Sequence, residues 1–141
     1  MTPITKAREH ESLSRCRAFV IPILLLCLPS LGYAETEVEI CRRLAPKYKA
    51  VTEYRLPDAA RVDLLTDTEA IEVDYAKKWA EAVGQSLYYG LATGKKPAII
   101  LLTRDTPRDR MAVFRCKAVC EKYAIHLYIE SLDPPTTPKE R

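Results

Sequence analysis

Segments with strand-like and helix-like hydrophobic patterns follow one another from residue 37 onward. Three early segments alternate apolar and polar positions between turn residues, as half-buried strands do. A later run, residues 98–103, is almost purely apolar, which is typical of a strand covered on both faces. The predicted helices are residues 37–44, 75–91 and 107–122, and the predicted strands are 51–56, 60–66, 70–75, 98–103 and 125–129. This order, α-β-β-β-α-β-α-β, predicts a single α/β domain with a mixed (α+β) sheet.

Carboxylates are expected to converge on one face of the hairpin made by the second and third strands. A two-residue turn between these strands sets Asp63 directly opposite Glu72, and Asp74 lies diagonally nearby. Like charges that face each other across a strand pair repel, and carboxylates arranged in this way usually serve to bind a divalent cation. A further carboxylate is expected from Glu53 or Glu37. We prefer Glu53, which a three-residue loop before the second strand would place opposite Asp63.

The next helix presents a second group of polar residues. At about 100° per residue, Lys78, Gln85 and Tyr89 lie within roughly 20° of one another around the helix axis. Lys77 points in another direction. Lys78 therefore either reaches into the site that Gln85 faces or is an ordinary solvated lysine.

Together these residues resemble the PD-(D/E)XK nuclease superfamily, whose fold is restriction-endonuclease-like. The resemblance lies in an Asp on the second strand (Asp63), a Glu-x-acid motif on the third (Glu72) and a Gln-x-x-x-Tyr motif on the helix (Gln85 to Tyr89). The helix motif is similar to that of the helicase-associated exonuclease branch, and the resemblance covers residues 37 to about 130. It implies that Asp63 and Glu72 hold Mg2+ or Mn2+, with the carbonyl of Val73 as a further ligand.

Phosphodiester hydrolysis gives an independent reason for these residue types, because Mg2+ prefers one or two carboxylates and activates a bound water. We therefore expect a metal-dependent nuclease that acts on DNA or RNA, with Lys78 and Gln85 catalytic and Tyr89 also contacting the substrate. The family expects lysine two residues after Glu72, where this chain has Asp74. The alternative is a noncatalytic binding or structural protein on the same fold that has lost the catalytic lysine.

The first 34 residues have the pattern of a signal peptide. A basic lead precedes the apolar run 18–31, and Gly32 and Ala34 stand where a signal peptidase reads small residues. Cleavage after Ala34 would give an exported protein, periplasmic or secreted, without a membrane segment; a retained anchor is the alternative. Residues 35–132 form the predicted nuclease-like domain, and the proline-rich residues 133–141 form a predicted flexible tail.

Charge gives no sign of bulk polyanion binding. The chain has a formal net charge of +3, and residues 1–34 hold four basic and two acidic side chains, so the remainder carries +1. Any nucleic-acid contact must therefore come from a local patch, such as residues 95–96 or the basic residues between 104 and 117.

Three cysteines remain after the predicted cleavage: Cys41, Cys116 and Cys120. Export makes a disulfide feasible, and we predict a bridge from Cys41 to one of the other two. Three buried free thiols are the alternative. There is no CxxC motif and His126 is the one histidine left, which argues against a zinc site.

Overall fold

A computed structural model describes residues 35–133 and confirms the predicted order of elements. The elements are α1 (Glu37–Tyr48), β1 (Val51–Arg55), β2 (Arg61–Leu65), β3 (Glu69–Tyr75), the 3-10 turn η1 (Ala76–Lys78), α2 (Trp79–Thr93), β4 (Lys96–Thr103), α3 (Pro107–Tyr123) and β5 (His126–Ser131). The strands form one sheet in the order β1-β2-β3-β4-β5. Pairing is antiparallel from β1 to β3 and parallel from β3 to β5, so the predicted fold class, a mixed α+β sheet, is confirmed.

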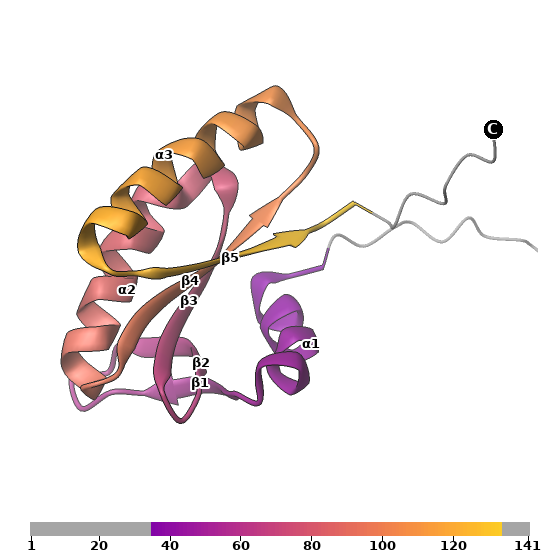
Figure 1. Ribbon diagram of the computed structural model, residues 1–141. Coiled ribbons are helices and arrows are strands. Elements are labelled where there is room, and N and C mark those ends of the chain that lie inside the picture. Colours follow the sequence, from indigo (N-terminus) through magenta and orange to yellow (C-terminus); the bar gives the residue numbers. More distant parts are fainter. Residues whose placement is uncertain (1–34, 134–141) are drawn as a thin grey trace, which may run out of the picture. The chain divides into compact units, whose positions relative to one another are not determined.

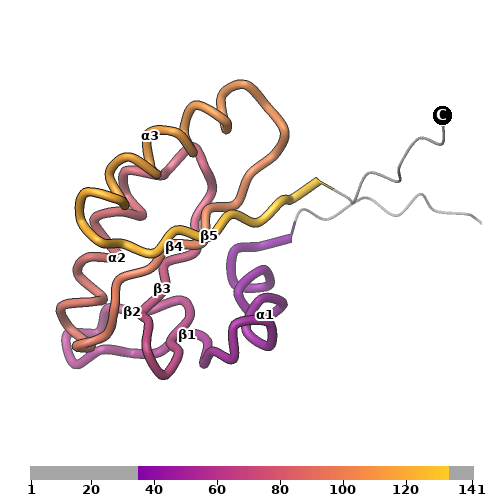
Figure 2. The backbone as a smooth tube through the Cα atoms, viewed as in Figure 1, coloured from indigo at the N-terminus to yellow at the C-terminus, as the bar shows by residue number. Residues whose placement is uncertain are grey.

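Helices cover both faces of this sheet, with α1 on one face and α2 and α3 on the other (Figure 1). The core accordingly has two large halves, besides a third, smaller cluster formed by Leu56, Val62, Ala70 and Tyr89. Alternate β4 residues point to opposite faces, so Ile100 packs with α1 residues whereas Ile99 packs beneath α2 and α3. Strand β4, between β3 and β5, is therefore buried on both sides, as its apolar sequence predicts (Figure 2).

Local sequence explains where the helices begin and end. Thr36 caps α1 through a capping box with Glu39, and Thr106 caps α3 just before Pro107. The predicted end of α1 at Leu44 is wrong, because the helix continues through Pro46 to Tyr48. A proline interrupts one helical hydrogen bond, and here the neighbouring turns hold the helix together for one turn more.

The hairpin of β1 and β2 separates from β3 halfway along. Strand β2 pairs with β3 only at Leu64↔Ile71 and Leu65↔Ala70, whereas it pairs with β1 at both of its ends, with no pair at Asp63. A continued ladder would offer the backbone N–H of Val73 to a β2 carbonyl. Instead, Val73 N donates to Oδ2 of Asp63 at 2.9 Å. The separation opens the sheet beside Glu72.

The three cysteines of the described residues are free and buried. Cys41 lies in the core half under α1, whereas Cys116 and Cys120 lie under α3 on the other face of the sheet. Sγ of Cys116 is 3.7 Å from Sγ of Cys120, which is not a bonding distance. The predicted Cys41 bridge is therefore wrong, and the alternative of three free thiols is confirmed.

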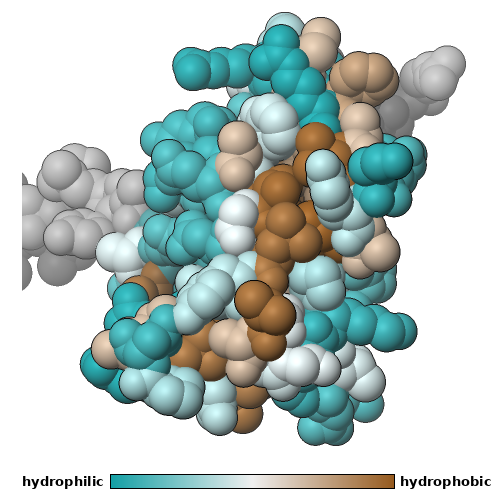
Figure 3. Space-filling model, turned by 90° about the vertical axis from the view of Figure 1, so that its left-hand side faces the viewer, coloured by the Kyte–Doolittle hydropathy of each residue, from teal (hydrophilic) through white to brown (hydrophobic). Residues whose placement is uncertain are grey.

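Residues 35–133 contain no helix that is both long enough and apolar enough to cross a membrane. The predicted signal peptide and nearly all of the predicted tail lie outside the described residues. On the outer surface of α2 and α3, apolar side chains gather in a stripe (Figure 3). Exposed apolar residues of these helices include Leu87, Leu91, Met111 and Phe114.

Candidate functional site

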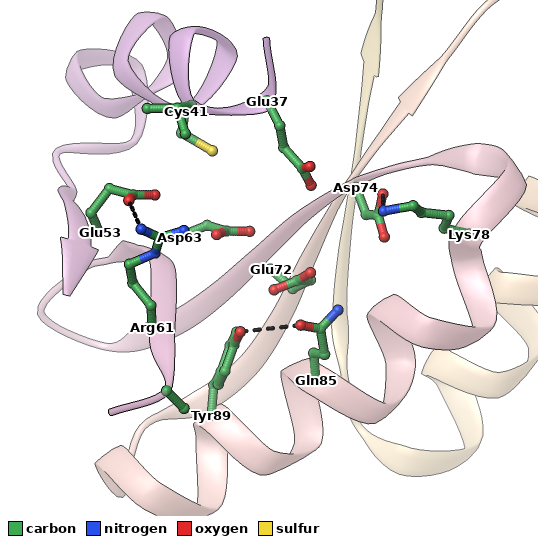
Figure 4. Close-up of a pocket in the computed structure, with 12 residues that line it drawn as sticks. Glu37, Cys41, Glu53, Arg61, Asp63, Glu72, Asp74, Lys78, Gln85 and Tyr89 are labelled. Carbon is green, nitrogen blue, oxygen red and sulfur yellow. Dashed lines mark hydrogen bonds and ion pairs between the residues drawn. The ribbon is translucent and has the colours of Figure 1, made fainter. Parts of the chain in front are cut away.

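The opening between the strands leads into a cavity of about 440 Å3 bounded by α1, the β1–β2 hairpin, β3 and α2 (Figure 4). Every residue that the sequence predicts for the site lines it. These residues are Glu53, Asp63, Glu72, Asp74, Lys78, Gln85 and Tyr89. Glu37, the alternative source of a further carboxylate, lines the same cavity. The structure therefore brings the predicted metal, catalytic and substrate residues together.

Strand register places the carboxylates as predicted. Thr66 N donates to the carbonyl of Glu69 at 2.9 Å, and continuing this count along the hairpin sets Asp63 opposite Glu72. Leu56 N donates to the carbonyl of Ala60 at 2.8 Å, so the preceding loop has three residues and Glu53 falls opposite Asp63.

Glu53 reaches the cavity through an unusual backbone conformation. Its φ of 57° lies in the left-handed region, which costs a non-glycine residue roughly 1–2 kcal/mol. Its Oε2 is 2.7 Å from Nη1 of Arg61, which lies two residues before Asp63 on β2. Strain of this kind persists where the surroundings enforce it, and such positions cluster at functional sites.

Two carboxylates on β3 are almost completely buried. Glu72 is 3% exposed and Asp74 is 1% exposed, and Oε2 of Glu72 and Oδ2 of Asp74 have no hydrogen-bond partner within residues 35–133. An unpartnered buried polar atom is costly, and few occur in a folded protein.

Burial raises the pKa of these acids. The pKa of Glu72 rises to about 9 through burial, with repulsion by Asp63 as the next cause, and burial raises that of Asp63 to about 6. The pKa values of Asp74 and Glu37 are also raised, chiefly by burial. At neutral pH Glu72 therefore holds a proton in the absence of a cation.

Lys78 reaches the site from η1 rather than from the α-helix. The predicted helix 75–91 is wrong at its start, because residues 76–78 form a 3-10 turn and α2 begins at Trp79. Nζ of Lys78 nevertheless lies 3.5 Å from Oδ1 of Asp74, whose charge raises the pKa of the lysine. Lys77 faces away, with its Nζ over the Tyr75 ring.

Gln85 and Tyr89 face the cavity from successive turns of α2. The hydroxyl of Tyr89 donates to Oε1 of Gln85 at 3.3 Å (Figure 4). This bond leaves Nε2 as the donor end of the amide, toward the carboxylates. Tyr89 is buried, and its pKa is raised, first by burial and then by the charge of Glu72.

Two polar residues that line the cavity, Arg61 and Cys41, were not predicted as site residues. Arg61 pairs with Glu53, and its place two residues before Asp63 on the same strand is the signal that puts both on one face. Cys41 lines the cavity from α1, and burial raises the pKa of its thiol to about 12. Its position depends on how α1 packs, which no local pattern specifies.

The donor atoms fit a hard divalent cation such as Mg2+ or Mn2+. The unpartnered oxygens of Glu72 and Asp74 are hard ligands, and a cation would satisfy them. Within residues 35–133, no three His, Cys, Asp or Glu side chains are gathered closely enough to enclose a metal ion. Mg2+ requires only one or two protein carboxylates, because it retains several waters. An open, incomplete ligand set therefore suits it.

Comparison with known proteins finds relatives in a virus. Two proteins of Acanthamoeba polyphaga mimivirus, each named as a KilA-N domain-containing protein, are similar to this chain. One is 33% identical over 90 residues, which cover 64% of this chain and 24% of the viral protein. The other is 30% identical over 106 residues, which cover 75% of this chain and 41% of the viral protein. This chain thus spans less than half of either relative, and no family model and no solved structure matches it.

Proposed function

We propose that this chain is a metal-dependent nuclease that hydrolyses phosphodiester bonds in DNA or RNA. The observation that carries the proposal is the pair of buried, unpartnered oxygens on Glu72 and Asp74, next to Asp63 in an open cavity. A purely structural site would satisfy these oxygens with hydrogen bonds. The names of the viral relatives give a domain and no reaction, so the proposal rests on the site.

Of the acids that the sequence predicts as ligands, Glu72 and Asp74 would hold the cation together with retained waters, and Asp63 and Glu53 would face it from β2 and β1. Bound Mg2+ or Mn2+ would polarise a phosphoryl oxygen and lower the pKa of a bound water to supply the nucleophile. Glu72 would give up its proton when it holds the cation, since a nearby positive charge favours the carboxylate that burial disfavours. Asp63 remains fixed by the bond from Val73 N.

Lys78, Gln85 and Tyr89 act on the substrate. The ammonium group of Lys78 stabilises the negative charge that develops on the phosphate in the transition state. The Nε2 donor of Gln85 binds a phosphate oxygen, and Tyr89 fixes the orientation of this amide through Oε1. Lys78 thereby supplies the positive charge that the family places on the strand.

A noncatalytic nucleic-acid-binding or structural protein on this fold is the second candidate. Asp74 favours it, because a carboxylate occupies the position of the family's lysine. The two candidates differ in one outcome, which is metal-stimulated cleavage.

The test uses the full chain and two matched variants. Calorimetric titration with MgCl2 and MnCl2 should show binding, and single- and double-stranded DNA and RNA should be cleaved with metal but not with EDTA. Glu72→Gln should weaken metal binding by about tenfold or more and abolish cleavage, in line with the loss of a ligand. Glu121→Gln, on the exposed face of α3, should change neither.

Metal binding without cleavage of any of these substrates would favour the noncatalytic candidate. Cleavage that survives both EDTA and Glu72→Gln would refute the metal site. Export belongs to the same proposal: intact-mass measurement of the exported protein should show an N-terminus at Glu35, and a mass that retains residues 1–34 would refute it.

A further inference from the structure

The first cavity has more acidic than basic side chains, which is unfavourable for the approach of a polyanion such as DNA or RNA. Five carboxyl side chains line the cavity, against the two cations Arg61 and Lys78. Both cations are already paired, Arg61 with Glu53 and Lys78 with Asp74. Without metal, the cavity therefore repels phosphates, and the part of a strand that flanks the reacting phosphodiester must be held by other groups.

A second cavity, of about 290 Å3, lies at the carboxyl ends of the parallel strands β3 and β4. Three cations line it: Lys77, Arg104 and Arg108. None of them forms an ion pair with another residue of the range 35–133. Asp109 is the one acid in its wall, and its Oδ2 already accepts a bond from Arg104 N at 2.7 Å. This cavity is thus positive where the first is negative.

The two cavities are neighbours along the chain. Asp74 and Lys78 line the first, and the three residues between them, 75–77, line the second. The Cα atoms of Lys77 and Lys78 are about 3.8 Å apart, as consecutive residues are. A strand of DNA carries one phosphate per about 3.4 Å of helix axis. A strand with one phosphate at the first cavity therefore brings neighbouring phosphates within reach of the second.

We infer that the second cavity is a phosphate subsite, which holds the backbone of the nucleic-acid strand whose scissile bond lies in the first cavity. This inference rests on the proposed nuclease function. Guanidinium groups bind phosphate oxygens in a bidentate manner, and two arginines line the subsite. The two lysines at positions 95 and 96 lie at the opposite end of β4, about 25 Å from Arg104 by strand length. They are therefore not part of the phosphate subsite.

The test measures binding and cleavage separately. The full chain, in EDTA, is titrated against a fluorescein-labelled single-stranded DNA oligonucleotide over a series of salt concentrations. Arg104→Ala and Arg108→Ala should each weaken binding and reduce the slope of log K against log salt by about 0.7, the value for one phosphate contact on a single strand. Arg104→Lys should keep the slope. Lys96→Ala, an exposed lysine at the far end of β4, should leave binding unchanged.

In the cleavage assay, the two arginine-to-alanine variants should raise KM and retain kcat, because they act on the ground state and the transition state alike. Unchanged binding in both variants, or an equal loss in Lys96→Ala, would overturn the subsite and leave the nuclease proposal standing. The expected loss of binding without metal-stimulated cleavage would show that the second cavity binds phosphate, but it would overturn the nuclease and with it the role of the subsite in holding a strand for cleavage. No binding by the unaltered chain would overturn the subsite, and the cleavage assay with metal would then decide the nuclease proposal by itself.

Discussion

Asp74 stands where the nuclease family has a lysine, and its surroundings show how a carboxylate is accommodated there. Its Oδ1 accepts a bond from Tyr75 N at 2.7 Å and lies 3.5 Å from Nζ of Lys78. Its Oδ2 has no partner within residues 35–133. One oxygen is thus fixed by the chain and the other is left for a ligand. The acid at position 74 is thus paired with a lysine four residues later in the chain.

Lys78→Ala should lower kcat for phosphodiester cleavage by about 10²–10³, the usual effect of removing one group that stabilises transition-state charge. Metal affinity should change little, because Lys78 is not a ligand. Lys78→Arg should restore part of the activity. Steady-state kinetics and calorimetry check this, with Lys96→Ala as the control. Equal kcat values for the two alanine variants would exclude a role for Lys78.

The free energy of unfolding of the metal-free protein should fall as pH rises. Folding raises the pKa of Glu72 from 4.5 to about 9, so between these values the folded state binds a proton that the unfolded state has lost. Stability then decreases through this window. Mg2+ should stabilise the protein more at pH 9 than at pH 6, because it binds the ionised carboxylates.

Urea unfolding at both pH values, with EDTA or MgCl2, measures this effect. Glu72→Gln should flatten the pH dependence and remove the stabilisation by Mg2+, whereas Glu121→Gln should retain both. A pH profile that is the same in Glu72→Gln and the unaltered chain would show that the buried carboxyl is not its source.

At the scale of elements, strand register is what the sequence specifies best. The turn at residues 67–68 sets the register that places Asp63 opposite Glu72, and a three-residue loop sets the register that places Glu53 opposite Asp63. Local hydrogen bonds close both turns, so the alternation of side chains decides the rest. This is why the predicted acids meet in one cavity.

The left-handed conformation of Glu53 predicts opposite effects of glycine at adjacent positions of β1. Glu53→Gly should be about 1–2 kcal/mol more stable than Glu53→Ala, because only glycine adopts a φ of 57° without strain. At Thr52, whose φ is negative, the order should reverse by about 0.5–1 kcal/mol. Urea unfolding of the four variants measures both differences. If the glycine variant is more stable than the alanine variant at both positions, or less stable at both, the left-handed φ of Glu53 would be contradicted.

Features that depend on tertiary packing were not predictable from local patterns. Separation of the β1–β2 hairpin from β3 depends on the Asp63 side chain replacing a ladder bond. The bridge from Cys41 fails because α1 and α3 cover opposite faces, and the spacing of cysteines does not encode the face. The 3-10 turn before α2 alters the helix phase, yet Lys78 still faces the site because the turn begins only two residues after Asp74.

At the scale of the whole molecule, one sheet connects two core halves. Ile99 and Ile100 are adjacent on β4 and fully buried on opposite faces. Each substitution, Ile99→Ala or Ile100→Ala, should lower the free energy of unfolding by about 2–5 kcal/mol. Both variants should still unfold in a single transition, seen alike by fluorescence and by circular dichroism, because the two core halves share a strand. Two separate transitions would mean that the halves unfold independently.

Strand β1 forms one open edge of the sheet, and the conformation of Glu53 bears on how this edge meets other molecules. Exposed edges with regular N–H and C=O groups recruit strands from other chains and lead to aggregation. Val51 and Tyr54 on this edge are exposed and apolar, which would increase that hazard on a flat strand. The left-handed residue between them interrupts the regular row of backbone groups, and its charge adds a further obstacle. Glu53, whose carboxylate lines the cavity, thereby also hinders edge-to-edge aggregation of the protein.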